Sequence, residues 1–428
     1  MIRYIFRCNI LIIMILCIIP FHASAQKLTL QQAIGEAIAR NPNLMKANHA
    51  IKAIKAEKWT TILPENPEVF TEYEGIPRGK KSFSGYGGRK IGISQELEFP
   101  LMYFYRGKYN DLEKTSATAE YFIFRNEVVC DVSKSFYRVL MLKEQMELYE
   151  EVVELTKSIY SKAQVKVDVG ESTSYETMKV RIDLAEAENR LLQVTKDCEF
   201  ALYELKLLLG RRKEDTIEIQ GDFMFTPVPV NLDSLKRAAM QLHPLLREAL
   251  TQVNQKKLEK KMVWLGLMPN IKVSYFQQNI REITPEEAWG SEIGLSLPVW
   301  GFLKNRGRVR AASHNLQAAG WQVETEKRNV LLNVEEAANR LEIAQNRALK
   351  YREDILSEVE ELVRIAERSY EEGEMGYLEV TEALRTLQRT KAGYYESIYE
   401  YLSADADLEK AIGVSLDREL LKSIEEEK

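Results

Sequence analysis

The sequence predicts an α+β membrane protein made of two similar halves, each of which combines long coiled-coil helices with a β-hairpin. Three observations support this prediction: an internal repeat with a period of roughly 202 residues, proline-free stretches with helical periodicity, and short segments of alternating apolar residues. The 428 residues are 45% hydrophobic and 29% charged, which excludes a wholly disordered or disulfide-stapled chain. The net charge of −5 argues against a nucleic-acid partner.

The chain opens with the pattern of a secretory signal peptide. Two arginines precede an apolar run that ends at Phe21, and three small residues follow, up to Ala25. This pattern predicts a mature chain that starts at Gln26. Cys17 does not follow a small residue, so lipidation is not expected. No later apolar run reaches about 18 residues, so any membrane role would have to use β-strands or contact with the membrane surface.

A tandem duplication follows the leader. Gly170 lies 128 residues after Pro42, and Gly373 lies 129 residues after Pro244. Each of these glycines is followed by another after 40 residues, at positions 210 and 413. The predicted divisions are a signal peptide at 1–25, a first repeat at 26–231, a second repeat at 232–413 and an acidic tail at 414–428.

Long helices are predicted where proline is absent. No proline occurs from 101 to 226 or from 299 to 428, and apolar residues recur there every three or four positions, which is typical of left-handed coiled coils. Gly170 and Gly373 are the predicted turns between paired helices. The first helix of each repeat should stack end to end on the third, beside the longer second helix. The predicted helices cover about 29–62, 102–169 and 172–209 in the first repeat and about 232–267, 303–372 and 377–412 in the second.

Between the first and second helices of each repeat the apolar period changes to two, which predicts strands. Apolar residues alternate with polar or small ones at 91–99 and 292–297, and the predicted partners are 68–74 and 270–279, through loops around 79–88 and 284–288. We expect Leu97, Ile293 and Leu295 to face lipid and Glu96, Glu98 and Ser296 to face a lumen. Aromatic residues border these strands at Tyr86, Phe99, Tyr103, Phe104, Trp289, Trp300 and Phe302.

Amphipathic strands with aromatic borders suit an outer-membrane barrel, and such a barrel requires several chains. Four strands cannot close, and an open strand edge cannot face lipid because its backbone groups would lack partners. Two chains would give eight strands and a filled interior, whereas three give twelve strands and room for water. The strand count favours three chains over two without deciding between them.

Taken together, the signal peptide, the duplicated halves, the hairpins within coiled coils and the glycine turns resemble the TolC family of outer-membrane efflux proteins. The resemblance covers nearly the whole mature chain. It implies a homotrimer with a twelve-stranded barrel in the outer membrane, on an α-helical tunnel that extends into the periplasm. Segment 63–68 (LPENPE) and the compact length resemble the heavy-metal branch, of the CzcC and CusC kind.

The function implied by this resemblance is that of a passive exit duct in a tripartite efflux system. Its partners would be outer-membrane lipid, a periplasmic adaptor and an inner-membrane pump of the RND type, and its cargo cations or small toxic compounds. Two alternatives stay open. One is the exit duct of a type I protein secretion system, which would have the same fold and a different pump. The other is a periplasmic coiled-coil scaffold without a channel.

The resemblance also implies a periplasmic gate beside the helix turns. Counted from Gly373, Tyr370 matches a gate tyrosine, and Glu379 and Glu382 match two acids of the aperture. Counted from Gly170, Glu176 matches the acid that partners the tyrosine, while Met375 replaces a gate arginine. The plainer interpretation is that the glutamates are solvated and that Tyr370 packs in the coiled coil. Their common position beside one turn favours the gate.

No catalytic, cofactor or metal site is predicted. The mature histidines His49, His243 and His314 are isolated, and neither a nucleophile elbow nor a phosphate loop occurs. His243 precedes Pro244 as Asn41 precedes Pro42, which indicates a structural role. Cys130 and Cys198 are predicted to be buried, unpaired thiols, because antiparallel helices would place them about 18 Å apart along the axis. An enzyme is therefore not expected.

Overall fold

The computed structural model describes residues 26–76, 78–79, 87–171, 173–280, 284–298 and 301–413. The predicted signal peptide and acidic tail, as well as Tyr86 and Trp300, lie outside these residues. The chain divides into two compact units, which we treat separately. The first unit comprises Met1–Arg40, Asp131–Pro227 and Ala344–Ser403, and the second comprises Asn41–Cys130, Val228–Ile343 and Ala404–Lys428.

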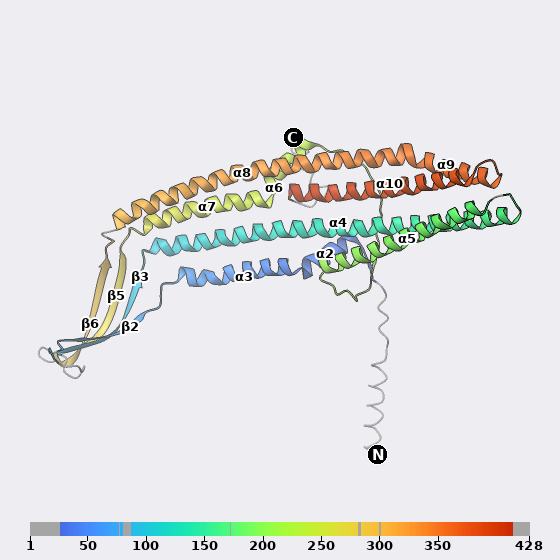
Figure 1. Cartoon of the computed structure of the whole chain (residues 1–428). Helices are drawn as coiled ribbons and strands as arrows, with labels where there is room; N and C mark the ends of the chain where they lie inside the picture. Colours follow the sequence, from blue (N-terminus) through green and yellow to red (C-terminus); the bar gives the residue numbers. More distant parts are fainter. Residues whose placement is uncertain are drawn as a thin grey trace, which may run out of the picture. The chain divides into compact units, whose positions relative to one another are not determined.

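Helices account for most of the described residues (Figure 1). The first repeat contains α2 (Leu30–Arg40), α3 (Pro42–Ile62), α4 (Pro100–Asp168) and α5 (Ser174–Leu208). The second repeat contains α6 (Leu232–Leu242), α7 (Pro244–Leu265), α8 (Gly301–Lys350), the π-helical turn η2 (Tyr351–Ile355), α9 (Leu356–Glu371) and α10 (Tyr377–Ile412). A short parallel pair joins β1 (Gln26–Leu28) to β4 (Ile217–Ile219) in the first unit.

The prediction of single helices at 29–62 and 232–267 is wrong, because each segment breaks just before a proline. The amide oxygen of Asn41 accepts hydrogen bonds from the backbone N–H groups of Asn43 and Leu44 at 2.9 and 3.3 Å, and α3 then begins at Pro42. In the second repeat, the Nδ1 atom of His243 accepts from the N–H of Leu245 at 3.2 Å. Proline is compatible with the first helical position only, so these N-caps mark new helices. The predicted structural role of His243 is confirmed.

The N-cap at His243 should make the protein less stable in acid. Burial lowers the pKa of the imidazole below its usual 6.5, although nearby Glu326 opposes the shift. The stability that depends on the neutral ring is complete above pH 6.5 and is lost as the pH falls through the lowered pKa, because protonated Nδ1 cannot accept a hydrogen bond. His243→Asn keeps a cap acceptor that does not titrate. We expect the loss of unfolding free energy from pH 7.5 to pH 5, measured by denaturant titration, to be smaller in this variant by about 1 kcal/mol. An equal loss in both proteins would contradict the assignment.

Glycine ends the long helices as the sequence predicts. Gly170 and Gly373 have φ values of +81° and +78°, and each lies in the turn that follows its helix. The backbone N–H of Glu171 bonds the carbonyl of Lys166 at 2.8 Å, and the N–H of Glu374 bonds the carbonyl of Ser369 at 2.8 Å. These reverse bonds satisfy helix carbonyls that would otherwise lack donors, and the left-handed φ favours glycine.

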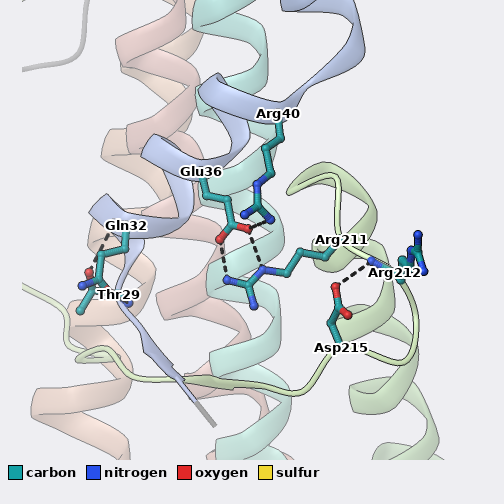
Figure 2. Close-up of polar contacts among 7 residues, drawn as sticks. All are labelled: Thr29, Gln32, Glu36, Arg40, Arg211, Arg212 and Asp215. Carbon is teal, nitrogen blue, oxygen red and sulfur yellow. Dashed lines mark hydrogen bonds and ion pairs between the residues drawn. The ribbon is translucent and has the colours of Figure 1, made fainter. Parts of the chain in front are cut away.

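An ion pair joins α2 to the end of α5 in the first unit (Figure 2). The guanidinium of Arg211 donates two hydrogen bonds to the carboxylate of Glu36, at 2.8 and 2.6 Å, and Arg40 donates a third at 2.6 Å. The side chains of Glu36 and Arg211 are each only 13% exposed. A Cβ on Gly210 would lie 3.2 Å from the Cβ of Arg40, so the two helix ends are in direct contact, in agreement with the predicted stacking.

The same stacking occurs in the second unit, at the end of α10. A Cβ on Gly413 would lie only 2.7 Å from Cδ of Pro244, and the glycine itself has φ of +89°. Asn126 on α4 donates a hydrogen bond to the carbonyl of Gly413 at 2.6 Å. The end of α10 therefore lies against the junction between α6 and α7.

The four predicted strands form one antiparallel sheet in the second unit (Figure 1). Its order is β2 (Glu68–Glu74), β3 (Gly88–Leu97), β5 (Asn270–Ile280) and β6 (Thr284–Ser296). The predicted loop at 284–288 is wrong, because β6 already begins at Thr284. Ile93 lies opposite both Val69 and Tyr275, and Val273 lies opposite Ile293. Among the described strands, β2 and β6 are each paired along one edge only.

This register gives the sheet one face that carries the exposed apolar residues and a second face that is polar or small apart from Phe70 and Phe276. The exposed apolar residues share a face: Val69, Ile91, Ile93, Val273, Tyr275, Trp289, Ile293 and Leu295. Leu97 lies on that face as predicted, and Glu96 and Ser296 lie on the other. Glu98 lies one residue beyond β3, so the prediction that it belongs to the alternating pattern is wrong. Its carboxylate instead binds Arg106 at 2.7 Å.

Neither of the two described cysteines, Cys130 and Cys198, forms a disulfide, as predicted. Cys130 is buried and its thiol donates a hydrogen bond to Asp407 at 3.6 Å. Cys198 is only half-buried, which corrects the prediction that both are buried. Because α5 carries polar residues on much of its surface, the position of Cys198 in the apolar repeat does not place it in the core.

Candidate functional site

The helix turns of the first unit lie next to an apolar core shared by four helices. Buried residues of α4, α5, α9 and α10 pack together there: Ile159, Ala163, Val180, Val359, Val363, Ala366, Tyr370, Tyr377, Val380, Ala383, Leu384 and Leu387. This core holds the first-repeat hairpin against the second-repeat hairpin. It therefore fixes the positions of the polar side chains beside the turns.

Tyr370 makes the contact with Glu176 that the resemblance implied. Its ring is 2% exposed, and its hydroxyl donates to Glu176 Oε1 at 3.1 Å. Burial, together with the Glu176 carboxylate, raises the pKa of the Tyr370 hydroxyl well above its usual value. Lys166 on α4 lies 4.1 Å from the centre of the ring and donates to the Tyr370 carbonyl at 2.8 Å. The tyrosine is thus a packing residue and a polar link at once.

Glu379 and Glu382 are both exposed on α10, three residues apart and on one side of the helix. In the part of the chain that the structure describes, neither carboxylate has a salt bridge. Glu379 lies in the first turn of α10, with one oxygen 2.9 Å from where a Cβ of Gly376 would be. An acid in a first turn is favoured by the helix dipole, which is a structural role in itself. The structure leaves both carboxylates accessible and does not bring them to Tyr370 or Glu176.

One polar cluster beside the turn was missed from the sequence. The hydroxyl of Tyr377 donates to Asp183 Oδ2, and Arg385 donates to Asp183 Oδ1 at 3.0 Å. Tyr377 is 194 residues from Asp183, and Tyr370 is 194 residues from Glu176. The equal offset is not a signal that the sequence offers, because Tyr370 and Tyr377 lie on opposite sides of the Gly373 turn, on helices that run in opposite directions.

The side chain of Met375 has neither a charge nor an N–H donor, so it cannot form the hydrogen bonds of an arginine. Its backbone N–H donates to the Ser369 carbonyl at 3.1 Å. Within the described residues, no three His, Cys, Asp or Glu side chains are grouped as metal ligands would be. None of the described helices is both long and apolar enough to cross a membrane.

The chain is similar to known proteins in both its sequence and its structure. A family model described as "Outer membrane efflux protein" matches residues 33–211 and again 235–414. The chain is 22% identical over 400 residues to the cobalt-zinc-cadmium resistance protein CzcC of Cupriavidus metallidurans, with 91% of each chain covered. The structure resembles CusC with a TM-score of 0.75 at 16% identity, over 91% of this chain and 93% of CusC. It resembles VceC of Vibrio cholerae with a TM-score of 0.74 at 16% identity, over 91% of this chain and 97% of VceC.

The duplicated hairpins and the amphipathic sheet define the fold of the TolC-like outer-membrane channels. The chain belongs to the outer membrane efflux protein family, which matches both of its repeats. It therefore acts in the outer membrane as an efflux protein, in a family of transport ducts rather than of enzymes. The predicted resemblance to the heavy-metal branch is confirmed by the similarity to CzcC.

Proposed function

We propose that three copies of this chain form the exit duct of a tripartite efflux system. The observation that carries the proposal is the four-stranded sheet, whose apolar face is exposed and whose outer strands are each paired on one side only. Ile293 and Val69, for example, are 75% and 81% exposed, which is costly in water and favourable in lipid. Three such sheets supply twelve strands and close around a water-filled lumen.

The remaining parts of the duct follow the same division of the sequence. Residues 1–25 are removed as a signal peptide, the repeats 26–231 and 232–413 form the duct, and 414–428 form a tail. The coiled-coil helices extend into the periplasm as a tunnel, and their ends meet a periplasmic adaptor and an inner-membrane pump of the RND type. The relative CzcC is named for resistance to cobalt, zinc and cadmium, which supports metal cations as the cargo.

Crosslinking tests the assembly. In native outer membranes, an amine-reactive crosslinker should give species of one, two and three subunits and none larger, and the trimer should shift its migration on heating. A stable monomer in detergent with full strand content would contradict the proposal, because a single sheet has two unpaired edges. Co-purification of the pump then separates an RND partner from the peptidase-linked transporter expected of a type I secretion duct.

The residues beside the turns form the periplasmic gate of this duct. Gly170 and Gly373 form the turns, and Glu379 and Glu382 line the mouth. The bond from Tyr370 to Glu176 holds α9 against α5, so its loss should favour opening. The support is geometric: the bond crosses between the two repeats and lies within one turn of Gly373.

Replacement of Tyr370 by phenylalanine should raise the resting conductance of the channel. The variant keeps the buried ring and removes only the hydroxyl link, which is worth about 0.5 to 1.5 kcal/mol, or up to about 3 kcal/mol if the carboxylate is charged. Planar-bilayer recordings at low voltage measure the change, and the trimer yield serves as the control for folding. Unchanged conductance at normal trimer yield would leave Tyr370 with a packing role only.

A further inference from the structure

Asp183 on α5 is bound by two residues of α10. Its Oδ2 atom accepts the hydroxyl of Tyr377, and its Oδ1 atom accepts a guanidinium N–H of Arg385 at 3.0 Å. The Asp183 side chain is 13% exposed, and the Tyr377 ring is 5% exposed. Both oxygens of this carboxylate are therefore used to hold α10 against α5.

This cluster lies in line with the bond between Tyr370 and Glu176. Glu176 and Asp183 are seven residues apart on α5, which is about two helical turns, so they lie on one side of the helix. Tyr370 lies in the last turn of α9, before the Gly373 turn, and Tyr377 is the first residue of α10 after that turn. One face of α5 is thus tied by tyrosine hydroxyls to both arms of the second hairpin.

Two features distinguish the contact from ordinary core packing. It is polar and lies at the edge of the apolar core of these four helices, to which the Tyr377 ring belongs. A hydrogen bond between two helices is easier to break than an apolar contact, because water can take the place of each partner when the helices separate. In addition, a cavity of about 250 Å³ adjoins it, lined in part by Asp183, Tyr377, Arg385 and Glu186. Close packing is the rule in protein interiors, so this space permits movement without a new void.

We propose that Tyr377, Asp183 and Arg385 form a second closing link of the channel, two turns along α5 from the link between Tyr370 and Glu176. Arg385 supplies from α10 the guanidinium contact that Met375 cannot make in the turn. The two links close the channel together, and opening breaks both. The proposal rests on the proposed gate and extends it to residues that position the mouth in its closed state.

The second link is tested by measuring the single-channel and macroscopic conductance of variants in planar bilayers. The variants are Asp183→Asn, Tyr377→Phe and Arg385→Ala, and Tyr370→Phe is the reference for the first link. We expect Asp183→Asn and Tyr377→Phe to raise the resting conductance about two- to tenfold, and the more exposed contact of Arg385→Ala to raise it about twofold. The resting conductance of the double variant Tyr377→Phe with Asp183→Asn should not exceed that of Asp183→Asn alone, because both substitutions remove the same link. Arg385→Lys should restore part of the closure.

Glu186→Gln is the matched control, because it removes one charge from the same cavity and the same helix. It should leave the resting conductance unchanged. If Glu186→Gln opens the channel as much as Asp183→Asn, or if Asp183→Asn and Arg385→Ala both conduct like the parent while Tyr370→Phe opens, the second link is refuted. A parent protein that forms no channel refutes the proposed function instead. If Asp183→Asn gives no trimer, the exposed Arg385→Ala and its lysine variant decide the result.

Discussion

Replacement of Ile293 by arginine should lower the free energy of unfolding of the assembled channel by about 2 to 4 kcal/mol. Ile293 is 75% exposed on the apolar face, midway along the chain between Trp289 and Leu297, which are 65% and 66% exposed. Trp289 is four strand residues, or about 13 Å, before Ile293, and β6 ends three residues after it, so Ile293 lies inside the apolar band. An arginine there would place a charge in the hydrocarbon region.

The control is Ser296→Arg, on the opposite face of the same strand, with Glu292→Arg as a second control nearer to Ile293. Both faces keep their backbone pairing, so the variants differ only in whether the new charge meets lipid or water. We expect the two controls to lose less than about 1 kcal/mol. The measurement is denaturant titration of the channel refolded into liposomes. Equal losses at Ile293 and Ser296 would mean that the lipid-facing side has been assigned to the wrong face.

The double variant Glu379→Ala with Glu382→Ala should bring the cation-to-anion permeability ratio of the channel toward one. In a trimer these positions supply six carboxylates around one mouth, and a ring of acids attracts cations and repels anions. Both side chains are exposed, and the structure shows no ion pair for either among the described residues, so their charge is available to ions in the pore. The reversal potential in a salt gradient measures the ratio, and block by divalent cations should weaken with it.

The control for this prediction is a pair of acids on the same helix that lie far from the mouth. At physiological salt the screening length is about 8 Å, so only acids close to the narrowest part of the path should matter. Glu396 and Glu400 lie about five turns further along α10, and Glu400 is paired with Arg347 at 2.7 Å. Their double alanine variant should keep its selectivity. Unchanged selectivity in the variant of Glu379 and Glu382 would leave both glutamates as solvated residues of the helix surface.

Much of the fold could be predicted because its signals are local. Glycine at the left-handed turns, the absence of proline and the change of apolar period from 3.5 to two placed α4, α5, α10 and the strands β2, β3 and β5 to within a few residues, whereas β6 begins eight residues before its predicted start. The break between α2 and α3 was also visible, because Pro42 cannot lie inside a helix, and its omission was an error of interpretation. The π-helical turn Tyr351–Ile355 has no comparable sign in the residues that form it.

The candidate site was less predictable because it depends on how distant helices align. The positions of Tyr370 and Glu176 came from resemblance to a family, and the structure confirms their contact. The bonds of Asp183 to Tyr377 and Arg385 depend on the register between α5 and α10. The heptad pattern of each helix is compatible with several registers that differ by whole turns, so it does not determine which residues meet. Tyrosine, aspartate and arginine are common on coiled-coil surfaces, so none of the three stands out in the sequence.

The unpaired edges of β2 and β6 make assembly a question of concentration as well as of structure. In a trimer each edge is completed only by another copy of the chain, so the closed barrel gains its last backbone hydrogen bonds when subunits meet. Its stability is then not a property of one chain, and dilution opposes it by mass action. The rate at which channels appear in a membrane should therefore rise more steeply than in proportion to the amount of chain that has been exported.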